Sequence, residues 1–449
     1  MSGVPLLQDI VVLLLASLPV VFVCQKLGLP GLVGFLITGM TIGPSAGGLI
    51  YSHHNVEILA EVGVALLLFT IGLEFSLGRL ASMGRTIVGA GLLQIGLTAA
   101  VTAGACIIGG LGTIQALVIG YIVSLSSTAI VLKVLADRGE LQAPHGQLSL
   151  SVLLFQDFSV LPMLLLLPLL GDPANAEPLA VLRSLGIAIA AIGVILVTAR
   201  RLLPAILEQI VRLRSQELFL GVIVVVCFGT AWLASTMGIS IAIGAFIAGI
   251  VVSESEYSEQ VVAEVLPLRD LFSSIFFVSV GMLLDLSFLV GHGAEVFLIL
   301  AAIMVLKALA GTVAVLPFRA SPRVAVLVGV TLAQVGEFSF VIAGEARSLG
   351  VLDPTDFQGV LAASVFSMVL APLVSRGASG FLNVRDLPGF KPESTGSIPR
   401  GHHVILAGYG LAGESIGRVL SDTSIPHCVV DFDVDVAGRA EADGPDAVR

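Results

Sequence analysis

Long apolar runs recur along the whole chain of 449 residues, and they limit its possible folds more than any other feature. Each run is about 18 to 25 residues long, the length that an α-helix needs to cross the hydrocarbon core of a bilayer. The runs show no alternation of period two, which favours packed helices over a transmembrane barrel. Because 56% of the residues are hydrophobic and only 12% are charged, the sequence predicts an all-α polytopic membrane protein and not a soluble one.

Runs separated by glycine, proline or charge predict thirteen transmembrane helices, beginning near residues 8, 31, 57, 86, 113, 147, 180, 217, 239, 268, 294, 322 and 357. Basic residues concentrate in cytoplasmic loops, so their distribution tests this count. Loops after even-numbered spans hold Arg183 and Arg347, whereas loops after odd-numbered spans hold Lys26, Arg79, Arg85, Lys133, Arg138, Arg200, Arg201, Arg212, Arg214, Arg269, Arg319 and Arg323. This asymmetry predicts a multi-pass protein of the cell inner (plasma) membrane with its N-terminus outside and its C-terminus cytoplasmic.

The predicted spans contain an internal repeat. The stretch KLGLPGLVGFLITG at 26–39 aligns with TMGISIAIGAFIAG at 236–249, which superposes Gly28, Gly34 and Gly39 on Gly238, Gly244 and Gly249. The same shift of 209 to 210 residues pairs Gly72 with Gly281, Gly120 with Gly329 and Pro162 with Pro372. Because one extra span separates two sets of six, the two six-helix repeats are inverted. Inverted repeats are typical of secondary transporters, whose site lies at the midplane between the copies.

A single ionisable side chain, Asp157, lies within the predicted sixth span at 149–170, with Gln156 beside it. A carboxylate near the middle of a bilayer costs roughly 2.5 to 3.5 kcal/mol to insert, so it needs a partner, a wet cavity or a passing cation. We therefore predict that Asp157 and Gln156 belong to a cation- and proton-binding site. The alternative is an aspartate that merely forms a hydrogen bond between helices.

Two repeat-related spans carry polar residues and glycine at the same depth. The fifth span has Ser124, Ser126, Ser127 and Thr128, and the twelfth has Gln334, Gly336, Glu337 and Ser339. Such residues satisfy backbone groups that are freed where a transmembrane helix is interrupted, so we expect two crossed, broken helices. Their polar side chains are further candidates for the binding site. Ordinary back-bonding of serine and threonine, with small-residue packing, is the alternative.

Lys307 is the only lysine deep within a predicted span. Its ammonium cannot easily reach the membrane surface from that depth, so we expect it to form an ion pair with Asp157. The repeat does not duplicate these charges, because Ser367 corresponds to Asp157 and Thr98 corresponds to Lys307. A structural ion pair without a role in transport is the alternative.

Six segments, among them SLSSTAIVLKVLADRGEL, LLFQD, EVGVALLLFTIGLEF and TLAQVGEFSF, together resemble the monovalent cation:proton antiporters of the Kef type. The resemblance covers nearly the whole chain and implies a homodimer whose mobile core exchanges K⁺ for H⁺. The family's Gln-Asp pair maps onto Gln156 and Asp157, and its crossed-helix motifs map onto the polar residues of the fifth and twelfth spans. Relatives with two adjacent carboxylates are mainly sodium exchangers, so Gln156 indicates the potassium branch. Glu259 and Val262 depart from the pattern of glutathione-gated members.

The composition changes near the end of the thirteenth span. We expect a transmembrane exchanger domain at 1–382, a linker at 383–401 and a truncated Rossmann-like segment at 402–449. The last part has a strand, a glycine turn, a helix and a second strand. Gly408, Gly410, Gly413 and Asp431 match the dinucleotide fingerprint, in which glycines approach phosphates and the acid binds ribose hydroxyls.

The stretch HVILAGYGLAGESIGRVL resembles the start of an RCK-type nucleotide-binding regulatory domain. The resemblance implies AMP or NAD(H) as a ligand of the full-length form, whereas transport requires no cofactor. We expect the chain to be a truncated form whose nucleotide-binding piece is poorly ordered and binds nucleotide weakly, if at all.

These features together predict a secondary transporter and not an enzyme. In this hypothesis, Asp157 alternately binds a proton or a monovalent cation, and exchange is electroneutral because one carboxylate is shared. Gln156 would favour K⁺ by offering a neutral carbonyl. A Na⁺/H⁺ antiporter is the alternative of the same class, and a nucleotide-gated potassium channel is the alternative of another class. No carbonyl filter such as TVGYG occurs in the sequence, which disfavours the channel. No nucleic-acid partner or structural metal is expected.

Overall fold

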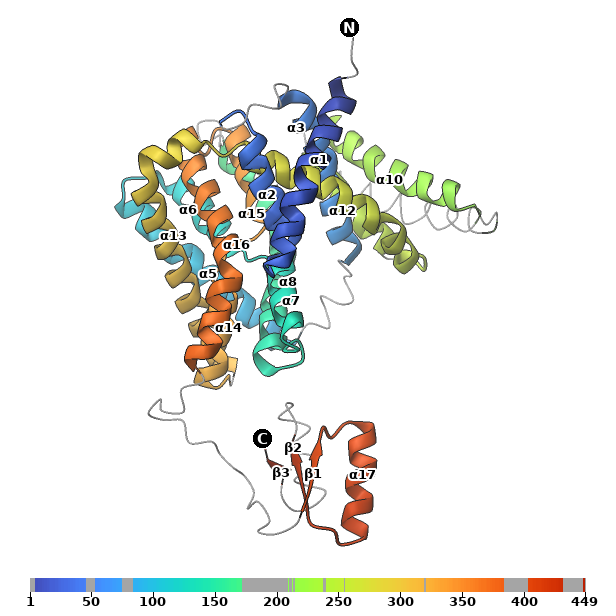
Figure 1. The fold of residues 1–449 in the computed structure, drawn as a ribbon. Coiled ribbons are helices and arrows are strands. Elements are labelled where there is room, and N and C mark those ends of the chain that lie inside the picture. Colours follow the sequence, from blue (N-terminus) through green and yellow to red (C-terminus); the bar gives the residue numbers. More distant parts are fainter. Residues whose placement is uncertain are drawn as a thin grey trace.

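The computed structural model describes residues 5–45, 53–74, 84–171, 209, 212, 215–236, 240–253, 255–318, 320–382, 403–430 and 447–448, and they are mostly helical (Figure 1). The first helices are α1 (Pro5–Lys26), α2 (Gly31–Ile42), α3 (His53–Glu74), α5 (Arg85–Ile108), α6 (Thr113–Ser124), α7 (Thr128–Asp137) and α8 (Pro144–Gly171). The next are α10 (Gln216–Thr236), α11 (Ile241–Ser253), α12 (Ser258–Met282), α13 (Leu286–Val315), α14 (Pro322–Thr331), α15 (Phe338–Ser348) and α16 (Pro354–Leu382).

Seven of the described helical segments are long and apolar enough to cross a membrane, and four shorter apolar helices accompany them. The segment Thr113–Asp137, which contains α6 and α7, is one of the seven. These segments confirm the prediction of a helical membrane protein. The predicted span near residue 180 lies outside the described residues, so the count of thirteen stays a prediction.

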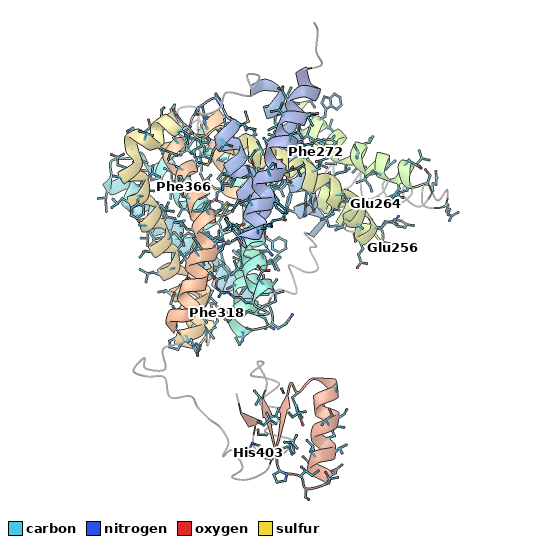
Figure 2. All side chains as sticks on the ribbon, in the orientation of Figure 1. Glu256, Glu264, Phe272, Phe318, Phe366 and His403 are labelled. Atoms are coloured by element: carbon cyan, nitrogen blue, oxygen red, sulfur yellow. The ribbon has the colours of Figure 1, made fainter. Side chains whose placement is uncertain are left out.

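Helix α12 begins earlier than the sequence predicted, because the expected start was near residue 268 and the helix begins at Ser258. Val261 and Val265, four residues apart, are buried in one cluster with side chains of α3 and α10. Gln216 of α10 also donates a hydrogen bond to the Glu264 carboxylate at 2.8 Å. Figure 2 shows Glu264 on this part of the helix. Burial of an apolar face therefore extends the helix into a segment whose charges had suggested a loop.

Contacts between the two repeats follow the sequence shift. Gly39 of α2 packs against α12, where an added Cβ would lie 2.0 Å from the Val278 carbonyl oxygen. The repeat-related Gly249 of α11 packs against α3 in the same way, since its Cβ would lie 2.1 Å from the Phe69 carbonyl oxygen. Each helix pair thus joins one helix of the first copy to one of the second. Glycine is required at both crossings because the backbones touch.

The tail forms a small parallel sheet. Strand β1 (Val404–Ala407) is followed by α17 (Leu411–Asp422) and then by β2 (His427–Val430), which pairs with β1. Strand β3 (Ala447–Val448) adds to the other edge of β2, so the order is β1-β2-β3 (Figure 1). Asp431, the predicted ribose ligand, lies outside the described residues.

Candidate functional site: the crossing of two broken helices

Two helices are interrupted at repeat-related positions and meet there. The first stops at Ser124 and resumes at Thr128, and the second stops at Thr331 and resumes at Phe338. The Gly336 amide donates to the Leu125 carbonyl at 3.0 Å across the crossing. A Cβ at Gly336 would lie 2.6 Å from the Ser126 carbonyl carbon, so the approach requires glycine. The prediction of two broken, crossing helices is confirmed.

The freed backbone groups find side-chain partners from the facing break. The Ser127 amide donates to Gln334 Oε1 at 2.8 Å, and Gln334 Nε2 donates to the Ser127 carbonyl at 3.3 Å. Ser126 Oγ donates to the Leu332 carbonyl at 2.9 Å. Ser127 Oγ accepts from the Ile130 amide and caps the N-terminus of α7. Gln334 and both serines therefore hold the crossing together.

Helix α8 contacts α5, α7, α14 and α15, and it brings Gln156 and Asp157 to the crossing. The half-buried Asp157 carboxylate accepts a hydrogen bond from Thr128 Oγ1, which lies 3.1 Å from Oδ2. Thr128 is the first residue of α7, so its hydroxyl stands where the helix restarts. The arrangement leaves a partly accessible carboxylate beside the positive end of a half-helix, where a small cation and a proton can compete.

Gln156 has a different role in the structure from the one that the sequence suggested. Its Oε1 accepts from the Ser126 amide at 2.7 Å, and its Nε2 donates to Gln94 Oε1 at 2.6 Å and to the Ser124 carbonyl at 3.2 Å. The carbonyl that was expected to select the cation is thus bound to the backbone of the break. The reason is that an interrupted helix leaves amide groups that must be satisfied within the protein.

Lys307 lies at the crossing but does not pair with Asp157, which corrects the sequence-based expectation. Its Nζ donates to the carbonyls of Val123, Ser124 and Leu125 at 2.6, 3.0 and 2.7 Å. These are the carbonyls at the end of α6, which carry the negative end of the helix dipole. Three acceptors match the three donors of an ammonium, and the side chain is fully buried.

Glu337 immediately precedes α15 and belongs to the twelfth-span side of the crossing. It is buried, and its Oε2 has no hydrogen-bond partner among the described residues. Ser339, two residues on, donates to the Ile122 carbonyl at 2.7 Å and ties α15 to α6. Glu337 therefore lies at the crossing of the two broken helices, where the sequence placed it.

Gln94 of α5 is a site residue that the sequence reasoning missed. It is fully buried and connects to Gln156, the Ser124 carbonyl and Thr98 Oγ1. A glutamine in the middle of an apolar run was the available signal, because a buried amide needs partners.

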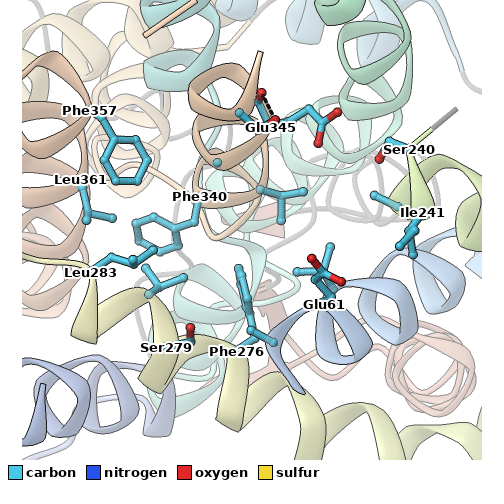
Figure 3. Close-up of a pocket in the computed structure, with 17 residues that line it drawn as sticks. Glu61, Ser240, Ile241, Phe276, Ser279, Leu283, Phe340, Glu345, Phe357 and Leu361 are labelled. Carbon is cyan, nitrogen blue, oxygen red and sulfur yellow. Dashed lines mark hydrogen bonds between the residues drawn. The ribbon is translucent and has the colours of Figure 1, made fainter. Parts of the chain in front are cut away.

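A cavity of about 480 Å³ lies between α3, α11 and α12 on one side and α15 and α16 on the other. Figure 3 shows Glu61 and Glu345 at its margins, with Phe276 and Phe340 projecting into it. The cavity thus separates two groups of helices, one of which carries the crossing.

A carboxylate beside two crossed, interrupted helices defines the class of ion-coupled secondary transporters. Residues 10–376 match the family model described as sodium/hydrogen exchanger, transmembrane, and the chain belongs to that family.

Three curated relatives sharpen this placement within the family. K(+) efflux antiporter 1, chloroplastic, of Arabidopsis thaliana is 36% identical over 444 residues, which covers 96% of this chain and 37% of the relative. Putative K(+) efflux antiporter KefB of Alkalimonas amylolytica is 33% identical, and the match covers 92% of this chain and 64% of the relative. K(+) efflux antiporter 5 of Arabidopsis thaliana is 33% identical, and the match covers 87% of this chain and 70% of the relative. The Kef-type resemblance is confirmed, and the chain spans little more than a third of the first of these relatives.

The solved structure of the sodium proton antiporter MjNhaP1 from Methanocaldococcus jannaschii at pH 8 has the same fold. The TM-score is 0.60 at 17% sequence identity, and the match covers 85% of this chain and 98% of the other. This likeness supports the antiporter fold.

Proposed function

We propose that the chain exchanges K⁺ for H⁺ across a membrane and that Asp157 is the group that both ions use. The contact between Asp157 and Thr128 at the restart of a broken helix carries this proposal. Both ions need the negative charge of one carboxylate, so binding of either excludes the other. Alternating exposure of that carboxylate to the two sides couples the two fluxes, and a single shared charge makes the exchange electroneutral.

The identity of the cation rests on the relatives, whose names state K(+) efflux. The presence of a neutral glutamine at 156 also favours potassium, because one carboxylate gives a weaker field than two. Competition between K⁺ and Na⁺ in proteoliposomes tests this part of the proposal. A better rate with Na⁺ would assign the chain to sodium exchange instead.

The decisive experiment replaces Asp157 by asparagine. Proton flux driven by a K⁺ gradient in proteoliposomes should fall to background in Asp157→Asn while the amount of folded protein is unchanged. Asp137→Asn is the matched control, since Asp137 ends α7 in an exposed pair with Lys133. Exchange at the wild-type rate in Asp157→Asn would refute the assignment.

We propose that the protein lies in the inner (plasma) membrane, with its N-terminus outside and its C-terminus in the cytoplasm. We also propose that two chains form a homodimer. Exposed apolar side chains on α1 and α10, including Leu15, Leu18, Val225 and Trp232, suit lipid or a second chain. Labelling of single cysteines from each side of sealed vesicles tests the orientation.

We also propose that the glycine turn after β1 binds the phosphates of a nucleotide such as AMP or NAD(H). Gly408 has a φ of +93°, and a Cβ at Gly413 would lie 2.0 Å from the Gly408 carbonyl oxygen. The turn is therefore tight, and it opens onto the N-terminus of α17, which suits phosphate. Calorimetric titration of the purified protein with each nucleotide should give weak binding, and the absence of any binding would refute the phosphate site.

A further inference from the structure

We propose that Gln94 is a positioning residue of the cation site and that it sets the affinity of the site for its cation by fixing the Gln156 amide. The proposal rests on the exchange function proposed above. Gln94 belongs to none of the motifs that carry the family resemblance, and its side chain bonds to Gln156, the Ser124 carbonyl and Thr98.

The Gln94 amide is fully engaged in the interior. Its Oε1 accepts from Gln156 Nε2 at 2.6 Å, and its Nε2 donates to the Ser124 carbonyl at 3.1 Å and to Thr98 Oγ1 at 3.3 Å. The side chain has no exposed surface. A buried amide with this many partners is held in one orientation, because every alternative leaves polar atoms unpaired.

This orientation determines that of Gln156. Only an NH₂ group can donate to Gln94 Oε1, so Gln156 must direct its Nε2 toward α5 and its Oε1 toward the Ser126 amide. A reversed Gln156 would oppose two oxygen atoms at one end and two N–H groups at the other. Gln94 therefore decides whether the break in the fifth span has an acceptor for its freed amide.

The break in turn positions the ligands. Ser126 precedes the Ser127 cap, and α7 begins at Thr128, whose hydroxyl contacts Asp157. A shift of the backbone at 124–126 moves Thr128 relative to the carboxylate, while the carboxylate itself remains. Loss of Gln94 should therefore weaken cation binding and not abolish exchange. The repeat places Ile303 at the position equivalent to Gln94, so the second copy offers no substitute.

Two variants test the role of Gln94, and both are compared with wild type for half-saturating K⁺, maximal rate and K⁺-dependent thermal stabilisation. Gln94→Leu removes the amide, and the loss of a buried hydrogen-bond partner should raise half-saturating K⁺ by about tenfold. The maximal rate should change by less than about threefold, because Asp157 stays in place and the change affects mainly the affinity for K⁺. Thr102→Val is the control on the same helix, because Thr102 Oγ1 is buried with no partner in the described part of the chain.

Gln94→Glu gives the readout that a purely structural residue would not give. A protonated glutamate accepts from Gln156 and donates to the Ser124 carbonyl, as glutamine does. A carboxylate would repel that carbonyl oxygen and attract the ammonium of Lys307, which donates to the same carbonyl at 3.0 Å, so the break would be disturbed. Half-saturating K⁺ should therefore be near wild type at acid pH. As the pH increases, it should fall in wild type because fewer protons compete for Asp157, whereas in Gln94→Glu it should fall less or rise. The variant has the size of the native residue, so it serves even where Gln94→Leu does not fold.

Unchanged half-saturating K⁺ in Gln94→Leu, or an unchanged pH profile in Gln94→Glu, would overturn the positioning role. The thermal shift with K⁺ measures binding without exchange, and this separates the two hypotheses. Absence of exchange in the wild-type protein would count against the proposed function. A K⁺-induced shift in melting temperature that is equal in wild type and both variants would count against Gln94.

Discussion

The ammonium of Lys307 lies 2.7 Å from the carbonyl oxygen of Leu125, just beyond the point where α6 ends. The ammonium also donates to the carbonyls of Val123 and Ser124, so each of its three N–H groups has an acceptor. The positive charge thus neutralises the negative end of a half-helix.

Replacing Lys307 by methionine should destabilise the protein strongly. The change removes a charged donor from three buried carbonyls. Ser124 keeps the amide donors of Gln94 and Gln156, and Leu125 keeps the Gly336 amide, so we expect a loss of about 1 to 3 kcal/mol. Thermal unfolding of the purified protein in detergent measures this loss. Lys26→Met is the control, since Lys26 is exposed at the end of α1 and stacks on Phe22. Equal melting temperatures for the two variants would contradict the bracing role of Lys307.

Removing the hydroxyl of Thr128 should weaken cation binding. Thr128→Val keeps the shape of the side chain but removes the hydrogen bond to the Asp157 carboxylate, so half-saturating K⁺ should rise about tenfold. Thr128→Ser should restore most of the affinity. Thr70→Val is the comparison, because the Thr70 hydroxyl bonds within its own helix to the Leu66 carbonyl. Wild-type affinity in Thr128→Val would remove this residue from the site.

Adding a methyl group at Gly249 should separate α3 from α11. The new Cβ would fall 2.1 Å from the Phe69 carbonyl oxygen, so the helices must move apart at a cost of about 1 to 3 kcal/mol. Gly229→Ala in α10 is the matched control, because its Cβ would meet nothing within 4 Å. That control should stabilise the protein by roughly 0.5 to 1 kcal/mol. A melting temperature of Gly249→Ala at or above that of wild type would be inconsistent with backbone contact.

The position equivalent to Asp157 in the second repeat should matter for folding and not for ion choice. Ser367 Oγ accepts from the Val335 amide at 3.0 Å, much as Gln156 accepts from Ser126 in the first copy. Ser367→Ala should cost about 1 to 3 kcal/mol because that amide loses its acceptor. Ser364→Ala is the control, since its hydroxyl bonds to the Val360 carbonyl within the helix. A changed preference between K⁺ and Na⁺ in Ser367→Ala would show that the second repeat also takes part in ion choice.

The two interrupted helices were predictable because their cause is local. Polar residues and glycine within an apolar run indicate freed backbone groups, and the shift of 209 to 210 residues shows that the two interruptions correspond. Glycines at 39 and 249 could likewise be found from spacing alone. These features depend on residues that are near one another in the sequence, so hydropathy and the spacing of small residues reveal them.

Partners across the crossing could not be predicted, because they depend on how each helix is rotated and where it crosses its neighbours. Lys307 and Asp157 were paired by charge, yet the fold brings Lys307 to the carbonyls at the end of α6. Gln94 was visible only as a polar residue in an apolar run, and its hydrogen-bond partner Gln156 lies 62 residues away in the sequence. The sequence alone determined that a membrane-embedded carboxylate lies near two broken helices. Only the tertiary structure decided which buried groups satisfy the backbone there, since a hydrogen bond requires two atoms to meet within about 3 Å.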